Sequence, residues 1–376
     1  MIYLDNAATT KVMPEAADGV IAGMTESFGN PSSMHKLGVN AERLVSFSQR
    51  KLLSALGDSS GRIIFTSGAT ESNNTAIFGL AEIYGRRKKR VVTTSVEHPS
   101  VAKAFERLAE MGYEVATVHP NEQGEITEDM LVKAVDSNTC LISAMLVNNE
   151  TGYILPIDKA FPKIKKLYPD CMTHCDCVQG FEKLHVSVKK LGCDALSLSG
   201  HKIYAPKGIG ALYLKSGVRI KPLMLGGGQQ NALRSGTEPV PLIYGMGRAV
   251  EALDPTIDER LAHVREINAY ARNALAQIGA VVLSSPKASP YILSIAVPEI
   301  KSETVLHHLE ASQIYVSSGS ACSKGKKSGV LAEFKVSEKY IDSVIRLSFS
   351  YENNKEDIDL LAAKLKDGMD SLAKIK

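Results

Sequence analysis

The sequence lacks any apolar run approaching the ~20 residues that cross a bilayer, so we expect no membrane-spanning helix. Its start, MIYLDN, has neither the basic region nor the apolar core of a signal peptide. The net charge is only +3, which is too small to indicate a nucleic-acid or membrane partner. These absences predict a cytoplasmic protein that binds neither nucleic acid nor membranes.

Cysteine is also scarce, because six in 376 residues are too few for a disulfide framework, and we expect reduced thiols. Three of them lie in "CMTHCDC", for which a zinc site is the alternative interpretation. Cys171, Cys175 and Cys177 would share one face of a strand. Neighbours on that face stand ~6.6 Å apart along the strand, too far for ligands ~2.3 Å from one zinc ion. We therefore expect these thiols to pack in the core and the protein to hold no metal.

The chain is long enough for one large domain and a smaller one. From residue 62 to residue 214, short β-branched runs alternate with amphipathic stretches, which predicts an α/β fold with a mainly parallel sheet covered on both faces. We expect strands at 62–66, 90–95, 114–118, 140–147, 171–175, 195–198 and 209–214. Helices are expected at 71–84, 100–111, 128–136 and 158–168.

The C-terminal third has a different pattern. A long helical region is expected at 242–278, strands at 280–284, 292–297, 314–317 and 343–349, and helices at 303–312 and 356–373. Strands with helices on one side predict a small α+β domain. We predict a large domain over 15–255 and a small domain made of 1–14 and 256–376.

Polar and titratable residues follow five of the predicted strands. Ligands of open α/β sheets bind beyond the carboxyl ends of the strands, so these segments are expected to meet. They are "SGATES" (67–72), "VEHPS" (96–100), "VNNETG" (147–152), "CDCVQG" (175–180) and "SGHK" (199–202). In the first, small residues lead from a strand into a helix whose N-terminus would favour an anion. An ordinary N-cap by Ser67 or Thr70 is the alternative, but beside the other four segments phosphate binding is the better explanation.

Lys202 lies in a loop too short for a crossover helix, so the strands on either side are expected to pair as an antiparallel hairpin. A partly desolvated lysine loses its proton more readily and can form a Schiff base with an aldehyde, whereas a solvated turn with a chance lysine is the alternative. Asp176 ends its strand and would be a cap or turn residue. Opposite an aromatic ring nitrogen it would instead keep that nitrogen protonated, which makes pyridoxal phosphate an electron sink.

Three more side chains suit the same kind of site. His98 is either a loop histidine or a ring that stacks on a flat cofactor, and Asn148 and Gln179 are amides of the kind that fix a phenolic oxygen. Arg346 ends a strand of the small domain, where its fork of donors fits the α-carboxylate of an amino acid. A surface or interface ion pair is the alternative for Arg346. Arg234 is expected to serve structurally at an interface.

A second group of residues lies in "YVSSGSACSKGKKSGV" (315–330). Cys322 follows a predicted strand, in a loop whose Ser, Gly and Lys content is typical of mobile segments. Three lysines nearby would favour the nucleophilic thiolate: Lys324, Lys326 and Lys327. The alternative is an incidental surface cysteine.

Taken in order, these segments resemble the cysteine desulfurases of the NifS/IscS type, within the class V aminotransferase family. The resemblance starts at "YLDNAATT" and "FGNPSSMHKLG" and continues through "FTSGATESNN", "EHPSV", "VNNETG", "CDCVQG", "SGHKIYAPKGIG" and "GGGQQNALRSGTEPVP" to "SSGSAC" and "IRLS". It covers nearly the whole chain. It implies a homodimeric, pyridoxal phosphate-dependent enzyme of fold type I, with active sites at the subunit interface.

The resemblance also implies roles for individual residues. It places the Schiff base on Lys202, the partner of the ring nitrogen at Asp176 and the stacking ring at His98. It assigns the ring oxygen to Asn148 and Gln179, and the substrate to Arg346 and Asn148. Its phosphate contacts are Ala69, Thr70, Ser199, Gly200 and His201, with Thr237 from the other subunit.

The implied reaction converts L-cysteine to L-alanine and leaves the sulfur on Cys322 as a persulfide, for a sulfur-acceptor protein of an iron–sulfur cluster or thionucleoside pathway. One alternative is a selenocysteine lyase or related β-eliminase, which would not depend on Cys322. Another is an inactive protein that scaffolds a sulfur-transfer complex. Retention of both Lys202 and Cys322 favours the enzyme.

Overall fold

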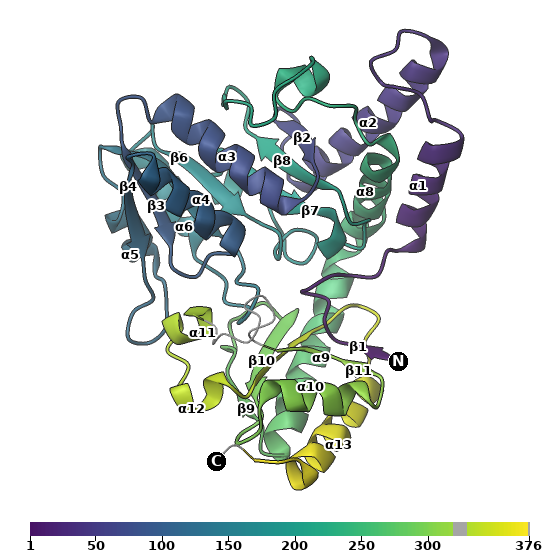
Figure 1. Cartoon of the computed structure of the whole chain (residues 1–376), viewed down its shortest axis with the longest axis vertical. Helices are drawn as coiled ribbons and strands as arrows, with labels where there is room; N and C mark the ends of the chain where they lie inside the picture. The colour runs from purple at the N-terminus through teal and green to yellow at the C-terminus, as the bar shows by residue number, and fades with distance from the viewer. Residues whose placement is uncertain (319–328, 375–376) are drawn as a thin grey trace.

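A seven-stranded sheet forms the centre of the larger part of the molecule in the computed structural model, which describes residues 1–318 and 329–374 (Figure 1). The strand order is β2-β8-β7-β6-β5-β3-β4. Their bounds are β2 Arg62–Thr66, β3 Arg90–Thr94, β4 Glu114–Val118, β5 Thr139–Met145, β6 Met172–Asp176, β7 Ala195–Ser199 and β8 Gly210–Leu214. Only β8 runs antiparallel to its neighbours, β2 and β7. The mainly parallel sheet and its hairpin are therefore confirmed.

Helices cover both faces of this sheet. On one face, Ile64 and Leu141 pack in a core with Phe105. On the other face, Phe65 packs in a second core with Phe161. The covering helices are α3 Ala69–Tyr84 and α4 Pro99–Glu110 on the first face, and α2 Lys36–Ala55, α6 Ile157–Leu167 and α8 Val240–Leu253 on the second. Strands buried on both faces explain why the sequence shows apolar runs here rather than alternation.

Two N-terminal helices precede the first predicted strand, α1 Pro14–Thr25 and α2. The sequence pattern gave no element before residue 62. Helix α1 packs closely on α8, since a Cβ at Gly23 would come within 2.7 Å of the Cα of Pro241. The larger part of the molecule also contains two short helices, α5 Glu128–Lys133 and α7 Val188–Leu191.

The predicted helical region at 242–278 is divided into α8 and α9 Ile257–Gln277 by a short 3₁₀ segment, Asp254–Thr256. Pro255 lies in this segment, and a proline has no backbone N–H to continue the helical ladder. None of the helices within the described residues is long and apolar enough to cross a membrane.

The C-terminal third forms a separate core around a four-stranded antiparallel sheet, of order β12-β13-β10-β9. The strands are β9 Val281–Val282, β10 Ile292–Ala296, β12 Ser317–Ser318 and β13 Val344–Ser348. The helices are α9, α10 Ser302–Glu310, α11 Gly329–Glu333, α12 Glu338–Ile341 and α13 Lys355–Ser371. The strand predicted at 314–317 is two strands, since β11 Ile314–Tyr315 leaves this sheet and pairs with β1 Ile2–Tyr3.

The first residues of the chain belong to the C-terminal core. Ile2 and Leu4 are buried there with Ile295 and Leu309. In Figure 1 the N-terminus accordingly lies beside β11, far from α1, which packs on the larger part of the molecule. The segment between β1 and α1 therefore runs from one core to the other.

Candidate active site

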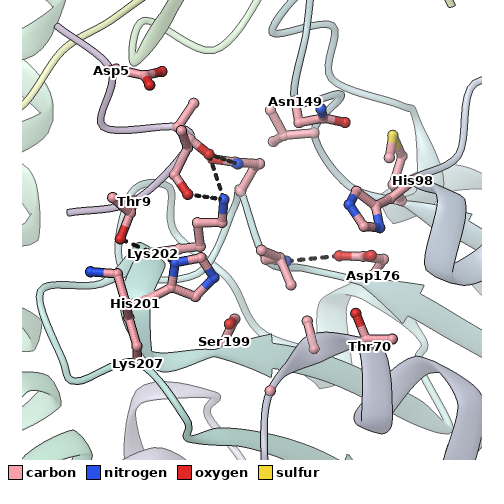
Figure 2. A pocket seen from close by; sticks show the side chains of 18 of the residues that line it. Asp5, Thr9, Thr70, His98, Asn149, Asp176, Ser199, His201, Lys202 and Lys207 are labelled. Carbon is pink, nitrogen blue, oxygen red and sulfur yellow. Dashed lines mark hydrogen bonds between the residues drawn. The ribbon is translucent and has the colours of Figure 1, made fainter. Parts of the chain in front are cut away.

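A cavity of about 670 Å³ lies where the large sheet faces the C-terminal core (Figure 2). Its walls come from the carboxyl ends of β6 and β7, the start of α3, the segment after β1, and β13. They bring together these predicted site residues: Ala69, Thr70, His98, Asp176, Gln179, Ser199, His201, Lys202 and Arg346. Residues more than 270 positions apart in the chain thus meet in one space.

Lys202 ends a short 3₁₀ turn that follows β7. Its Nζ donates hydrogen bonds to the backbone carbonyls of Ala7, at 2.6 Å, and Ala8, at 2.7 Å. The hairpin beneath it is tightly packed, because a Cβ at Gly210 would come within 2.6 Å of the Cα of Gly68. The amine therefore points into the cavity wall formed by the N-terminal segment, not into solvent.

The N-terminal segment is fastened across the Lys202 turn. The backbone N–H of Thr10 donates to the carbonyl of His201 at 2.8 Å, and its hydroxyl accepts from the N–H of Tyr204 at 2.7 Å. The ring of His201 lies 3.2 Å from the hydroxyl of Thr9 (Nδ1 to Oγ1). Burial lowers the pKa of His201 to about 4, and the charge of Lys202 acts in the same direction. His201 is therefore a neutral imidazole at neutral pH.

The carboxylate of Asp176 is held from two sides at the end of β6. Its Oδ1 accepts from the N–H of Val178 at 3.1 Å, and its Oδ2 accepts from the side-chain amide of Asn73 at 2.8 Å. The same Asn73 nitrogen also donates to the hydroxyl of Ser100, which in turn lies 2.8 Å from Nδ1 of His98. Figure 2 shows His98 and Asp176 across the cavity from Lys202. A ring placed between them would meet an imidazole and a fixed carboxylate.

His98 is the N-cap of α4, and its Nδ1 accepts from the N–H of Ser100 at 3.1 Å. Burial lowers the pKa of His98, against the opposing charge of Asp176. A neutral ring with an acceptor at Nδ1 carries its proton on Nε2. The ring is thus fixed in position and uncharged, which suits stacking on a flat, electron-poor group.

The start of α3 forms another part of the wall, and the N-cap residue Gly68 has no side chain to cap it. Glu71 lies in the first turn, where a free carboxylate would repel an anion. Its carboxylate instead accepts from Arg234 at 2.8 Å and from the N–H of Ser67 at 2.8 Å. Although burial alone would raise it, these hydrogen bonds lower the pKa of Glu71. Because Arg234 balances the charge of Glu71, this helix N-terminus can receive an anion.

Arg346 reaches the cavity from β13 and is buried. One guanidinium nitrogen, Nη2, donates to the carboxylate of Asp5 at 2.9 Å, and Nη1 donates to the carbonyl of Asn149 at 2.8 Å. Burial raises the pKa of Asp5, against the opposing effect of Arg346. The ion pair foreseen as the alternative for Arg346 therefore exists, but it lies in the cavity wall rather than on the surface.

The structure places Asn148 behind the cavity wall rather than in it. Its amide nitrogen donates to the carbonyl of Val96 at 3.0 Å, and its oxygen accepts from the N–H groups of Glu150 and Thr151. The side chain is fully buried, so it shapes the turn after β5. The neighbouring Asn149, from the same "VNNETG" segment, lines the cavity.

Two other predicted residues, Gly200 and Thr237, do not line the cavity. Gly200 lies behind it, where a Cβ would come within 2.7 Å of a methyl carbon of Ile209. Thr237 is exposed, in the loop that follows Arg234. Cys322 lies outside the described residues. Within those residues, no group of three or more His, Cys, Asp or Glu side chains is arranged to hold a metal ion.

Several cavity residues carried no role in the sequence analysis. The N-terminal segment supplies Asp5, Ala7, Ala8 and Thr9 to the wall. They belong to the "YLDNAATT" segment, but its pattern gives no sign that its backbone carbonyls reach a lysine about 195 positions away. Lys207 and Gly208, just after the Lys202 turn, line the wall as well.

The chain is similar in sequence to known proteins. The family model "Aminotransferase class-V" matches residues 2–361. "Cysteine desulfurase IscS" of Dictyoglomus turgidum is 38% identical over 363 residues, 95% of this chain and 92% of that protein. "NifS/IcsS protein homolog" of Lactobacillus delbrueckii subsp. bulgaricus is 39% identical over 381 residues, 100% of this chain and 99% of that protein.

Solved structures are similar as well. A "NIFS-LIKE PROTEIN" superposes with a TM-score of 0.91 at 34% identity, covering 97% of this chain and 98% of that one. "SspA in complex with cysteine" superposes with a TM-score of 0.82 at 30% identity, covering 94% of this chain and 100% of that one.

Proposed function

Because the chain belongs to the aminotransferase class-V family, we propose that it is a cysteine desulfurase that converts L-cysteine to L-alanine and passes the sulfur on to an acceptor. The observation that carries the proposal is a lysine amine and a fixed carboxylate in the walls of one cavity, Lys202 and Asp176. Relatives bearing this name match over nearly their whole length. The direct test is to incubate the purified protein with pyridoxal phosphate and L-cysteine and to measure L-alanine.

The residues of the cavity fit pyridoxal phosphate. Lys202 supplies an amine for the aldehyde, and Asp176, held by Asn73 and Val178, supplies a carboxylate for the ring nitrogen. The neutral ring of His98 offers a flat surface, and the start of α3 offers an N-terminus for the phosphate. When bound, the cofactor supplies an electron-poor ring that stores the electron pair left when the α-proton departs.

The protein's own groups then carry the proton and hold the substrate. The amine of Lys202 would take the α-proton of the substrate. Asp176, whose carboxylate is held by two donors, would keep the ring nitrogen of the bound cofactor protonated. The guanidinium of Arg346 binds the substrate carboxylate, in competition with Asp5, which accepts from it in this structure.

Sulfur transfer is assigned to Cys322. Its thiolate attacks the substrate sulfur, so that an S–S bond forms as the carbon–sulfur bond breaks. The electron pair of the broken bond goes to the substrate carbon, which is protonated to give L-alanine. The persulfide on Cys322 then awaits an acceptor protein, and both the acceptor's pathway and the cytoplasmic location remain predictions.

Arg346→Gln is expected to raise KM for L-cysteine by about 10- to 100-fold, because a hydrogen bond between charged groups contributes ~1.5–3 kcal/mol. Steady-state alanine formation at varied L-cysteine measures this. Arg265→Gln, which changes an exposed arginine of α9, is the matched control and should leave KM unchanged. A fall in kcat with an unchanged KM would show that Arg346 does not bind the substrate in its ground state.

We also propose that two copies of the chain form the active unit. Large apolar side chains are exposed in two segments of the structure. They are Ile21, Met24, Phe28, Met34, Leu37 and Val39 in the first segment, and Leu223, Met224 and Leu225 in the second. In Figure 1 both segments lie at the upper end of the molecule. Exposed apolar surface of this kind is typical of subunit interfaces.

A mixing experiment tests whether the second copy completes the cavity. Lys202→Ala and Thr237→Asp are each expected to be inactive, the second because its charge repels a phosphate. Randomly mixed dimers should regain up to about a quarter of wild-type activity, because half of them hold one unaltered site out of two. If the mixture stays inactive although it elutes as a dimer, Thr237 does not act across the interface.

A further inference from the structure

Lys183 is a buried lysine beside the cavity, and the proposed reaction gives this lysine no role. It lies in the turn after β6, and only 5% of its surface is exposed. Its Nζ donates to the side-chain oxygen of Gln179 at 2.8 Å. No carboxylate of the described residues forms an ion pair with it. Burying an amine in this way costs free energy, so its retention calls for a reason.

The contact with Lys183 fixes which way the amide of Gln179 faces. An amide has a donor end and an acceptor end, whereas a protonated lysine amine can donate but cannot accept. The oxygen of Gln179 must therefore face Lys183, which turns the NH2 group toward the cavity, where it donates to the carbonyl of Ala7 at 2.9 Å. The same carbonyl accepts from Lys202. A continuous chain of hydrogen bonds thus connects Lys183, through Gln179 and Ala7, to Lys202.

We propose that Lys183 is a positioning residue: it holds the Gln179 amide with its NH2 group toward the cavity and, as a second positive group, disfavours the charged form of Lys202. This inference rests on the proposed function, because its consequence concerns bound pyridoxal phosphate. An acceptor oxygen on the cofactor ring would then meet a donor at Gln179. The neutral Lys202 amine is also the form that attacks an aldehyde.

The electrostatics agree with this geometry. Burial, with the charges of Lys202 and Arg346 acting in the same direction, lowers the pKa of Lys183 to about 7. Such repulsion is reciprocal, so at pH values below about 7, where Lys183 is charged, it also disfavours the charge on Lys202. His201 is the remaining titratable group that responds to Lys183, and burial already keeps it neutral.

The first experiment uses the cofactor-free protein, so that it does not depend on activity. Trace labelling with acetic anhydride across a pH series, followed by peptide mass spectrometry, gives the pH midpoint of the Lys202 amine. Lys183→Met should move this midpoint upward by about half a pH unit or more. Lys190→Met, an exposed lysine of α7, is the control and should not move it. An unchanged midpoint in folded Lys183→Met would overturn the electrostatic role.

The second experiment tests whether Lys183 acts through Gln179. In the cofactor-loaded protein, Lys183→Met and Gln179→Leu should each lower kcat for alanine formation by about tenfold. Since both break the same chain, the double variant should be no slower than the slower single variant. Multiplying effects would overturn the positioning role. If wild type forms no alanine, the proposed function fails, while the labelling result still reports on Lys183.

Discussion

Lys202→Ala is expected to lower alanine formation from L-cysteine by about 10⁴-fold or more, since it removes the covalent anchor and the proton carrier together. The variant should also lack the borohydride-sensitive visible absorption that a lysine-bound pyridoxal phosphate gives. Measuring both on the same preparation separates loss of the covalent bond from loss of the protein.

The structure explains why the buried amine of Lys183 does not replace it. The Lys202 amine is held by the carbonyls of Ala7 and Ala8, whereas Lys183 lies behind Gln179. Lys215→Ala is the matched control, because this exposed lysine follows the other end of the same hairpin. If Lys202→Ala still forms alanine at a tenth of the wild-type rate, the proposed chemistry is wrong.

Cys322→Ala is the second large effect, and it should abolish desulfuration of L-cysteine, by about 10³-fold or more. The other five cysteines are buried. Burial raises the pKa of Cys140 to about 11 and that of Cys171 to about 12, so neither is a thiolate at neutral pH. They cannot supply the nucleophile when Cys322 is lost.

The same variant distinguishes the alternatives. A selenocysteine lyase would keep releasing selenium from selenocysteine after the substitution, whereas a desulfurase loses its activity on L-cysteine. Cys140→Ala, which removes a buried thiol at the far end of β5 from the cavity, is the control for general damage. Alanine and persulfide are measured together. Unimpaired alanine formation in Cys322→Ala would exclude Cys322 as the sulfur acceptor.

The sheet could be predicted from sequence because its strands are short apolar runs flanked by polar loops. Five of those loops follow strands at the same edge of the sheet. Knowing the strands was therefore enough to predict that Asp176 and Lys202 lie near that edge. The division of 314–317 between two sheets could not be predicted, since it depends on pairing with β1, more than 300 positions away.

The composition of the site was harder to predict than its location. Two adjacent asparagines follow β5, and only the fold decides that Asn148 turns inward to hold its own loop while Asn149 lines the cavity. Asp5 contacts Arg346, and two backbone carbonyls contact Lys202. These contacts join distant segments, and no local sequence pattern predicts them. Lys183 shows the same limit, because a lysine in a turn is expected to be solvated.

The first ten residues connect the C-terminal core to the part of the molecule that holds the large sheet. One end is anchored by Ile2 and Leu4 in the C-terminal core, and the other supplies Ala7 and Ala8 to Lys202. The anchored end also pairs with β11, which shortly precedes Cys322 in the chain. A shift of the C-terminal core against the large sheet would therefore pull on the carbonyls that restrain the Lys202 amine, so the amine and the cysteine's attachment point are mechanically linked.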